Sequence, residues 1–386
     1  MAARQLDVQP LISHRFAFGD APQAYRVLTE DKSALGILLK YPDTGKDWAA
    51  REVVLDVAKV FEPTRPVLGF IGAGNYASRV LIPAFKKANA QLHTIVTEGG
   101  INGVINGKKA GFSAASTDVA AMLAKPAVNA VAIVTRHNSH ARFVVEALRA
   151  GKHVFVEKPL AINADELAEV RVAYGTAHEK GIGPHLMVGY NRRFAPQIIR
   201  MKSLLASVKE PKSFIMTMNA GAIPPDHWTQ VADVGGGRII GEACHYIDLM
   251  RFLAGSPIVS VQARRMGDSA GVSVTDDKAV IVLGFADGSF GAIHYLANGA
   301  AGFPKERVEV FAAGRVLQLD NFRKLTGYGW PGFSKMNLWR QDKGQAACVQ
   351  AFIDTISNGK TSPIPDNEIF EVARVTIEVV ELLRHQ

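Results

Sequence analysis

From Pro66 to about Gly189, short apolar runs rich in β-branched residues alternate with stretches of helical pattern. The apolar runs are VLGFIG (67–72), QLHTIVT (91–97), VNAVAIVT (128–135), KHVFVE (152–157) and HLMVGY (185–190). Each is apolar along most of its length, as is typical of strands buried on both faces. Helices between such strands predict a parallel sheet covered on both sides. We therefore expect a doubly wound α/β domain over residues 66–187.

After Asn191 the chain becomes rich in alternating, β-prone segments. These are SFIMTMN (213–219), SVQARRM (260–266), KAVIVLGF (278–285), FGAIHYLA (290–297), RVEVFAA (307–313) and GRVLQLD (314–320). Turn signals such as Asp287-Gly288 and Ala313-Gly314 connect them, which favours hairpins. Helices are expected near 196–207, 241–253, 345–358 and 366–384. The sequence predicts a second α/β domain, residues 188–386, built on a large, mostly antiparallel open sheet.

The charge balance limits the partners of this chain. A formal net charge of +8 favours anionic ligands such as phosphates, nucleotides or acidic sugars. Nucleic acid is the competing interpretation, but basic residues never run beyond pairs, so we expect no nucleic-acid partner. Two distant cysteines without a CxxC pair favour a reducing compartment. Since neither a signal peptide nor a membrane-spanning run is recognisable, the sequence predicts a cytoplasmic protein with no membrane partner.

A glycine-rich loop follows the first apolar run. Gly72, Gly74 and Ala77 form a G-x-G-x-x-A pattern, with Asn75 and Tyr76 inside it, between a strand and a helix. Gly72 permits a tight turn, Gly74 lets a pyrophosphate approach the main chain, and Ala77 keeps helix and strand close. The helix N-terminus then faces the anion. A glycine-rich turn that binds nothing is the alternative, but within repeated βαβ units we favour a Rossmann site for NAD or NADP.

The second strand usually separates NAD from NADP. Glu98 lies twenty-one residues beyond Ala77, about where an acid would hold a ribose 2′-hydroxyl group. Thr97 competes for the strand tip, and Lys108 or Lys109 could reach a 2′-phosphate. The sequence leaves the choice between the two cofactors open.

Reactive side chains follow two further strands of the predicted sheet. Glu157, Lys158 and Pro159 come at the end of one strand, and Thr135, Arg136, His137 and Asn138 at the end of its neighbour. Ligands of doubly wound sheets bind at this edge, so we assign these residues, with His140, to the cofactor side. A lysine there can polarise an oxygen or carry a proton. Pro159 would fix the turn, through a cis bond if required. For the triplet the alternative is a solvated surface turn, and His140 is more typical of a capping or packing residue.

Several ordered motifs carry a family resemblance. The EKP triplet, TRHNSHARFVVEALRAGKHV (135–154), VGYNRRFAP (188–196) and GGGRIIGEACHYIDL (235–249) together resemble the glucose-fructose oxidoreductase/inositol dehydrogenase (Gfo/Idh/MocA) family. The resemblance covers about residues 66–386. It implies a tightly held NAD or NADP and redox chemistry on a sugar or another polyol.

The resemblance also implies roles for two residues. Lys158 matches the catalytic lysine of the family, and His245 matches the histidine that acts as acid or base at the substrate hydroxyl. Family members often carry an aspartate four residues before that histidine, where this chain has Gly241. Glu242 could act in its place, so we include it among the candidate catalytic residues. Adjacent ligands such as Cys244 and His245 seldom converge on one ion, so we expect no metal.

The remaining candidates lie on the substrate side. Tyr190, Asn191, Arg192 and Arg193 enter the second domain directly after the last parallel strand. An arginine there suits a carboxylate or phosphate. Trp228 could stack on a sugar face or simply pack, and Asp248 follows His245 on the same helix.

Together these patterns predict an NAD(P)-dependent oxidoreductase acting on a secondary hydroxyl group of a sugar, polyol or nucleotide-sugar. One alternative is a lyase or glycosidase-like enzyme that oxidises its substrate transiently with bound NAD. Another is a cofactor-sensing binding protein without activity. We expect a homodimer or homotetramer, because an open sheet often has an exposed face that pairs.

Residues 1–65 form a separate N-terminal extension. They read as a strand, an Asp-capped helix, a strand and a linker up to Pro66. The segment resembles the end of a medium-chain zinc-type alcohol dehydrogenase without its metal ligands, which suggests a remnant or a fused piece.

Overall fold

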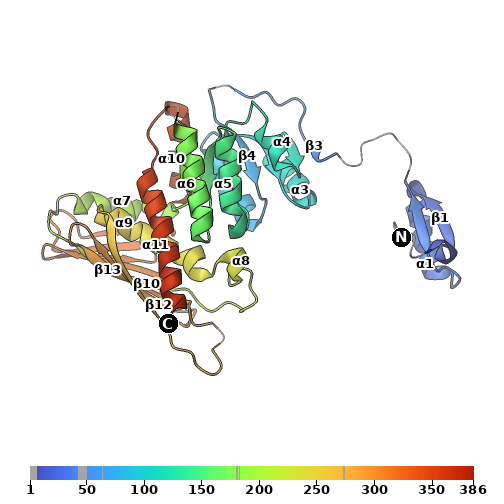
Figure 1. The fold of residues 1–386 in the computed structure, drawn as a ribbon. Coiled ribbons are helices and arrows are strands. Elements are labelled where there is room, and N and C mark those ends of the chain that lie inside the picture. Colours follow the sequence, from blue (N-terminus) through green and yellow to red (C-terminus); the bar gives the residue numbers. More distant parts are fainter. Residues whose placement is uncertain (1–6, 42–49, 63, 180, 182, 273) are drawn as a thin grey trace. The chain divides into compact units, whose positions relative to one another are not determined.

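A computed structural model describes residues 7–41, 50–62, 64–179, 181, 183–272 and 274–386 of the chain. These residues fall into two units, divided between Ala50 and Arg51. No helix in the described part of the chain is long and apolar enough to cross a membrane. Figure 1 shows the elements of each unit.

The first unit is a small βαβ segment. Strands β1 (His14–Ala17) and β2 (Ile37–Lys40) pair in parallel, and helix α1 (Ala21–Glu30) connects them. The expected strand–helix–strand order is confirmed. The expected cap is not, because the side chain of Asp20 makes no capping hydrogen bond. Residues 1–6, 42–49 and 63 of the expected extension and linker lie outside the described residues.

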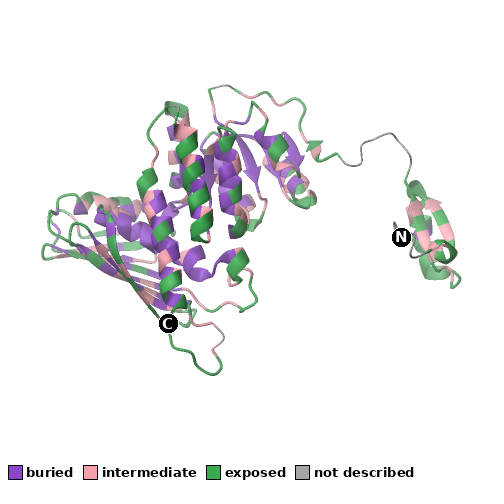
Figure 2. Ribbon diagram, in the orientation of Figure 1, coloured by how far each residue is buried: buried purple, intermediate pink, exposed green. Residues whose placement is uncertain are grey.

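The second unit begins with a seven-stranded sheet of order β3-β6-β5-β4-β7-β8-β9. Its parallel strands are β4 (Val67–Ile71), β5 (Gln91–Val96), β6 (Ala114–Ser116), β7 (Ala130–Ile133), β8 (His153–Val156) and β9 (Leu186–Val188). The helices between them are η3/α2 (Ala77–Leu81 and Ile82–Lys87), α3 (Ile101–Ala110), α4 (Val119–Leu123), α5 (His140–Arg149) and α6 (Ala164–His178). The doubly wound parallel sheet is confirmed. Figure 2 shows these strands buried while α5 and α6 expose their outer faces.

Two strands of this sheet were missed, β6 (Ala114–Ser116) and the edge strand β3. Strand β3 (Glu52–Val54) pairs antiparallel with β6 at the edge of the sheet, although residues up to Pro66 were expected to be a linker. Its backbone is held further by the hydrogen bond from Thr117 N to Arg51 O (2.8 Å). The three-residue strand is mostly exposed and has no apolar alternation to predict it.

The rest of the second unit is an α/β domain around an eight-stranded sheet of order β11-β12-β13-β10-β14-β15-β16-β17. Its strands are β10 (Ser213–Asn219), β11 (Ile258–Arg265), β12 (Lys278–Phe285), β13 (Phe290–Leu296), β14 (Glu306–Ala312), β15 (Arg315–Asp320), β16 (Lys324–Tyr328) and β17 (Lys335–Asn337). All neighbours are antiparallel except β10 and β13, so the predicted open sheet is confirmed.

The helices of this part of the chain join the open sheet to the parallel sheet. They are α7 (Pro196–Leu205), α8 (Ala232–Gly235), η6/α9 (Ile239–Ala243 and Cys244–Ala254), α10 (Gln345–Asn358) and α11 (Asp366–Arg384). Helix α11 packs both on α6, from the domain of the parallel sheet, and on α9, from the domain of the open sheet. Helix α10 packs on α2, which also belongs to the domain of the parallel sheet. A single core of buried side chains therefore runs through both sheets and holds their edges together.

Candidate active site

The glycine loop forms the turn that its sequence predicts. Gly72 has φ +103°, and a Cβ atom added to it would lie 2.4 Å from the carbonyl oxygen of Val134, so only glycine fits this position. A Cβ atom added to Gly74 would meet nothing within 4 Å, which leaves its main chain open. The helix starts at once, with Ser78 N donating to Gly74 O (2.9 Å). An accessible main chain beside a helix N-terminus suits a pyrophosphate.

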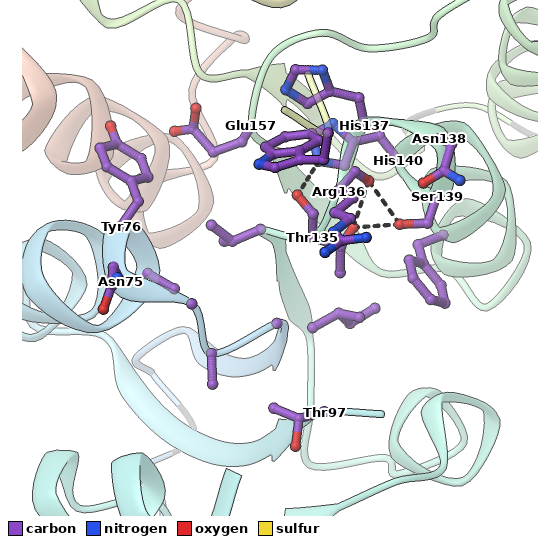
Figure 3. Close-up of a pocket in the computed structure, with 18 of the residues that line it drawn as sticks. Asn75, Tyr76, Thr97, Thr135, Arg136, His137, Asn138, Ser139, His140 and Glu157 are labelled. Atoms are coloured by element: carbon purple, nitrogen blue, oxygen red, sulfur yellow. Dashed lines mark hydrogen bonds between the residues drawn. The ribbon is translucent and has the colours of Figure 1, made fainter. Parts of the chain in front are cut away.

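This loop lines a cleft of about 2170 Å³ along the edge of the parallel sheet and over the second domain. A drug-sized ligand needs roughly 300–1,000 Å³, so the cleft has room for a dinucleotide and a small substrate together. Figure 3 shows residues from several strand ends around one part of it. The predicted site residues that line the cleft are Gly72, Gly74, Asn75, Tyr76, Ala77, Thr97, Glu98, Thr135, Arg136, His137, Asn138, His140, Glu157, Lys158, Asn191, Arg192, Trp228, Glu242 and His245. Tyr190, Arg193 and Asp248 do not line it.

At one end of the cleft, Thr97 and Glu98 follow β5. Glu98 is exposed, as an acid that holds a ribose hydroxyl group would have to be. Lys108 and Lys109, the alternative partners for a 2′-phosphate, lie in the last turn of α3 and do not line the cleft, which gives that alternative no support. Arg51, just before β3, also lines the cleft, and its guanidinium lies 3.3 Å from the carboxylate of Asp118. No motif in the sequence pointed to Arg51.

The segment after β7 carries two histidines with different surroundings. His140 is fully buried, with Nδ1 2.7 Å from Pro159 O, and burial lowers its pKa to about 4. It therefore ties the ends of β7 and β8 together, as the packing interpretation proposed. His137 places Nδ1 2.8 Å from Gly235 O, and its ring meets the edge of Trp228 at 4.8 Å between centroids. Burial, followed by the charge of Lys158, lowers the pKa of His137 to about 3, so its ring is neutral.

The Glu-Lys-Pro triplet turns from β8 into the cleft. The Lys158–Pro159 bond is cis, as the sequence suggested. Glu157 is buried, and burial, partly opposed by Lys158, raises its pKa to about 7. The ammonium group of Lys158 donates to the main-chain carbonyl of Gly241 in a short hydrogen bond. The second domain thus anchors this lysine through the residue at which a carboxylate was expected.

His245 lies on α9, facing the same cleft. Its side chain is buried, and among the described residues Nδ1 has no hydrogen-bond partner. Burial lowers the pKa of His245 well below its ordinary value, and the charges of Arg192 and Lys158 lower it further. The ring of Tyr190 meets it edge-on at 6.4 Å. A neutral imidazole that lines the cleft can accept a substrate proton at the ring nitrogen that faces the cleft.

Glu242 lines the cleft, and neighbouring side chains bind its carboxylate. It accepts hydrogen bonds from Tyr295 Oη (2.6 Å) and Arg238 Nη2 (2.9 Å), and Lys305 Nζ lies 3.2 Å away. Burial alone would raise its pKa, but Lys305, Tyr295 and Arg238 outweigh it and lower the pKa to about 2. These three side chains occupy the oxygens of Glu242, so its contacts fit a residue that organises the neighbouring cations.

Two arginines after β9 are held in buried ion pairs. Arg192 lines the cleft and places Nη2 2.5 Å from Glu306 Oε1, while Lys343 lies 2.9 Å from the other oxygen of Glu306. Asn191 donates to Lys343 O (2.7 Å). These contacts align several cleft residues, and Glu306 and Lys343 carried no recognisable motif. They come together only when β14 and the loop before α10 meet the end of β9.

Arg193 and Asp248 require a correction. Arg193 grips Asp248 with Nε and Nη2 and places Nη1 2.8 Å from Glu368 Oε2. All three lie behind the wall of the cleft, as does Tyr190. We therefore replace the expected substrate role of Tyr190, Arg193 and Asp248 with a supporting one. Among the described residues, no group of three or more His, Cys, Asp or Glu side chains could hold a metal ion.

Comparison with known protein families agrees with this architecture. Residues 67–183 match a family model described as an oxidoreductase family with an NAD-binding Rossmann fold. Residues 207–315 match the GFO/IDH/MocA C-terminal domain. The chain belongs to the GFO/IDH/MocA oxidoreductase family. Both matches lie beyond residue 65, so the resemblance of the N-terminal extension to a zinc-type alcohol dehydrogenase is not supported.

Individual relatives are sugar and polyol oxidoreductases by name. Myo-inositol 2-dehydrogenase of Thermotoga maritima is 30% identical over 225 residues, which are 57% of this chain and 64% of that protein. Levoglucosan dehydrogenase of Pseudarthrobacter phenanthrenivorans is 26% identical over 220 residues, which are 50% of this chain and 55% of that protein. The chain thus spans less than two thirds of the length of these curated relatives.

Solved structures share the fold over a longer stretch. A levoglucosan dehydrogenase in complex with NADH and levoglucosan has a TM-score of 0.72 at 20% identity, covering 83% of this chain and 97% of the other. An aldose-aldose oxidoreductase from Caulobacter crescentus, complexed with glycerol, has a TM-score of 0.70 at 20% identity, covering 83% of this chain and 98% of the other. At these identities the likeness establishes the fold alone.

Proposed function

We propose that this protein is an NAD(P)-dependent oxidoreductase that transfers hydride between a nicotinamide cofactor and a secondary hydroxyl group of a sugar, polyol or nucleotide-sugar. One observation carries the proposal: the glycine loop, Lys158 and His245 line a single cleft. The named relatives that act on inositol and levoglucosan support the substrate class.

The cleft suits the cofactor by its own geometry. Gly72 has no space for a side chain, whereas Gly74 leaves the main chain open in front of a helix N-terminus. Pyrophosphate would bind there, and the strand ends at Thr135 and Glu157 would flank the nicotinamide half. Glu98 would hold a ribose hydroxyl group, which favours NAD over NADP, in agreement with the NAD-binding family model. When bound, the cofactor supplies an acceptor for two electrons as hydride.

The protein's own residues would handle the proton and the oxygen. In the oxidation direction the neutral ring of His245 accepts the hydroxyl proton while the C–H electron pair leaves as hydride, and a carbonyl group forms. The ammonium group of Lys158 stabilises the negative charge that develops on the oxygen. Gly241 O holds that ammonium group in place, and Tyr190 packs against the ring of His245. The reverse reduction returns the same proton and hydride.

Two variants test these roles. Lys158→Ala and His245→Ala should abolish turnover of polyols, measured as NADH formation at its absorbance band, while NADH affinity, measured by fluorescence, stays near that of the parent protein. Lys209→Ala, at an exposed loop position that does not line the cleft, is the matched control. Full activity in either site variant would show that the assignment is wrong.

The alternatives predict different outcomes. A lyase or glycosidase-like enzyme would form product with no net change in nicotinamide absorbance, since the cofactor returns to its starting state. A cofactor-sensing protein would bind NADH and convert no member of a broad polyol panel. Lys158 and a neutral His245 line the same cleft, which favours net dehydrogenation over sensing.

A further inference from the structure

We propose that His137 is a positioning residue of the reaction site, where it fills the space that a side chain on residue 241 would occupy and thereby fixes the carbonyl group that holds Lys158. The proposal rests on the proposed function and deepens it, because it explains how the site works without an acid at position 241.

The close approach of two segments carries the argument. A Cβ atom added to Gly241 would lie 2.7 Å from His137 Cε1 and 3.3 Å from Nδ1. Real Cβ atoms essentially never come within 3.0 Å of another atom, and His137, buried at 6% exposure, has little room to move. The ring of His137, in the first of the two domains, therefore requires a glycine at position 241 of the second domain. An aspartate at 241 and a histidine at 137 exclude each other in this packing.

Three contacts hold the ring in this place. Nδ1 lies 2.8 Å from Gly235 O, and since a carbonyl group only accepts, Nδ1 carries the proton. Trp228 meets the ring edge-on at 4.8 Å, and the ring of His140 lies 5.7 Å away. The neutral tautomer leaves Nε2 unprotonated, and no hydrogen bond of Nε2 is seen within the described residues. Both His137 and Lys158 line the cleft.

This arrangement changes the electrostatic surroundings of Lys158. The ammonium group of Lys158 donates to the main-chain oxygen of Gly241, against which the ring of His137 packs. A neutral ring does not compensate the charge of Lys158 as an aspartate would. More of the positive charge then remains available to the substrate oxygen, with Glu157 the neighbouring carboxyl group that interacts with it. His137 therefore acts on the reaction through Gly241 and Lys158, without bonding to the substrate itself.

A cycle of variants tests the packing without any substrate. We would compare His137→Ala, Gly241→Asp and the double variant by thermal unfolding, with Gly175→Asp as a matched control, because a Cβ atom added to Gly175 meets nothing within 4 Å. We expect Gly241→Asp alone to lower the Tm far more than it does in the His137→Ala background. Equal effects in both backgrounds would overturn the proposal.

The same proteins test the role in the reaction. His137→Ala should lower kcat about 100-fold, as a small displacement of a catalytic group does. His137→Asn, whose amide can still donate to Gly235 O, should recover part of kcat, and His185→Ala, which lies outside the cleft, should not change it. Parental kcat in His137→Ala would overturn the proposal. If the parent protein converts no polyol, the proposed function fails by itself, and the stability cycle still decides the packing.

Discussion

The substitution Asp248→Asn separates a supporting residue from a substrate-binding one. Asp248 is 1% exposed and accepts two hydrogen bonds from Arg193, whose side chain is 3% exposed. Removing one partner of a buried ion pair costs about 3–5 kcal/mol, because the other charge stays buried without compensation. Arg193 keeps Glu368 at 2.8 Å, so we expect a loss of stability at the lower end, about 3 kcal/mol.

Urea unfolding followed by circular dichroism measures this loss, and steady-state kinetics on the same samples measures the site. The midpoint should fall at an unchanged slope, while KM for the substrate stays near the parental value, since Asp248 does not line the cleft. Asp165→Asn, at an exposed position of α6, is the matched control. A large rise in KM with parental stability would refute the supporting role and restore Asp248 to the substrate side.

Three further predictions concern the cleft. Gly72→Ala should destabilise the fold and weaken NADH binding, because residue 72 has φ +103° and an added Cβ atom would lie 2.4 Å from Val134 O. Gly175→Ala is the control. NADH affinity equal to that of the parent protein would contradict the role of this turn. Glu242→Gln should lower stability at neutral pH by about 1–3 kcal/mol. Because the pKa of Glu242 falls to about 2 in the folded state, this difference should be full above pH 4.5 and shrink as the pH falls toward 2; a difference independent of pH would argue against the ion pairs. Finally, kcat/KM for oxidation should not fall as the pH drops from about 7 to about 6, since the pKa of His245 lies well below 6.5 and the ring stays neutral; an acid limb near 6.5 would contradict this.

The sequence predicted the local parts of the site well. The helix 345–358 and the strand 278–285 have the bounds that their patterns predicted, because periodic burial is written into consecutive residues. The G-x-G-x-x-A loop and the cis Lys158–Pro159 turn are likewise local, since glycine and proline restrict the backbone where they stand. Strand β3 was missed because three exposed residues carry no period and are recruited only by the edge of β6.

The roles of charged residues were harder to predict, because each role depends on the ion-pair partner that the fold brings to the residue. Arg192 and Arg193 are neighbours in sequence. Arg192 lines the cleft and forms an ion pair with Glu306, whereas Arg193 lies outside the cleft and forms a buried ion pair with Asp248. Glu242 follows the expected acid position by one residue, but Tyr295 and Lys305 claim its oxygens. None of these partners is near in sequence.

By itself, the sequence determined the parallel sheet, the dinucleotide loop at Gly72 and the placement of Lys158 at a strand end, since each depends on residues that follow one another. Only the tertiary structure decided what surrounds Lys158. The fold brings His137 and Gly241 together from two domains. A Cβ atom added to Gly241 would lie 2.7 Å from His137 Cε1, which leaves no room for a side chain at residue 241. Lys158 therefore meets a main-chain carbonyl group and a neutral ring where an acid was expected. Close packing determines these contacts between distant segments, and a local sequence pattern does not predict them.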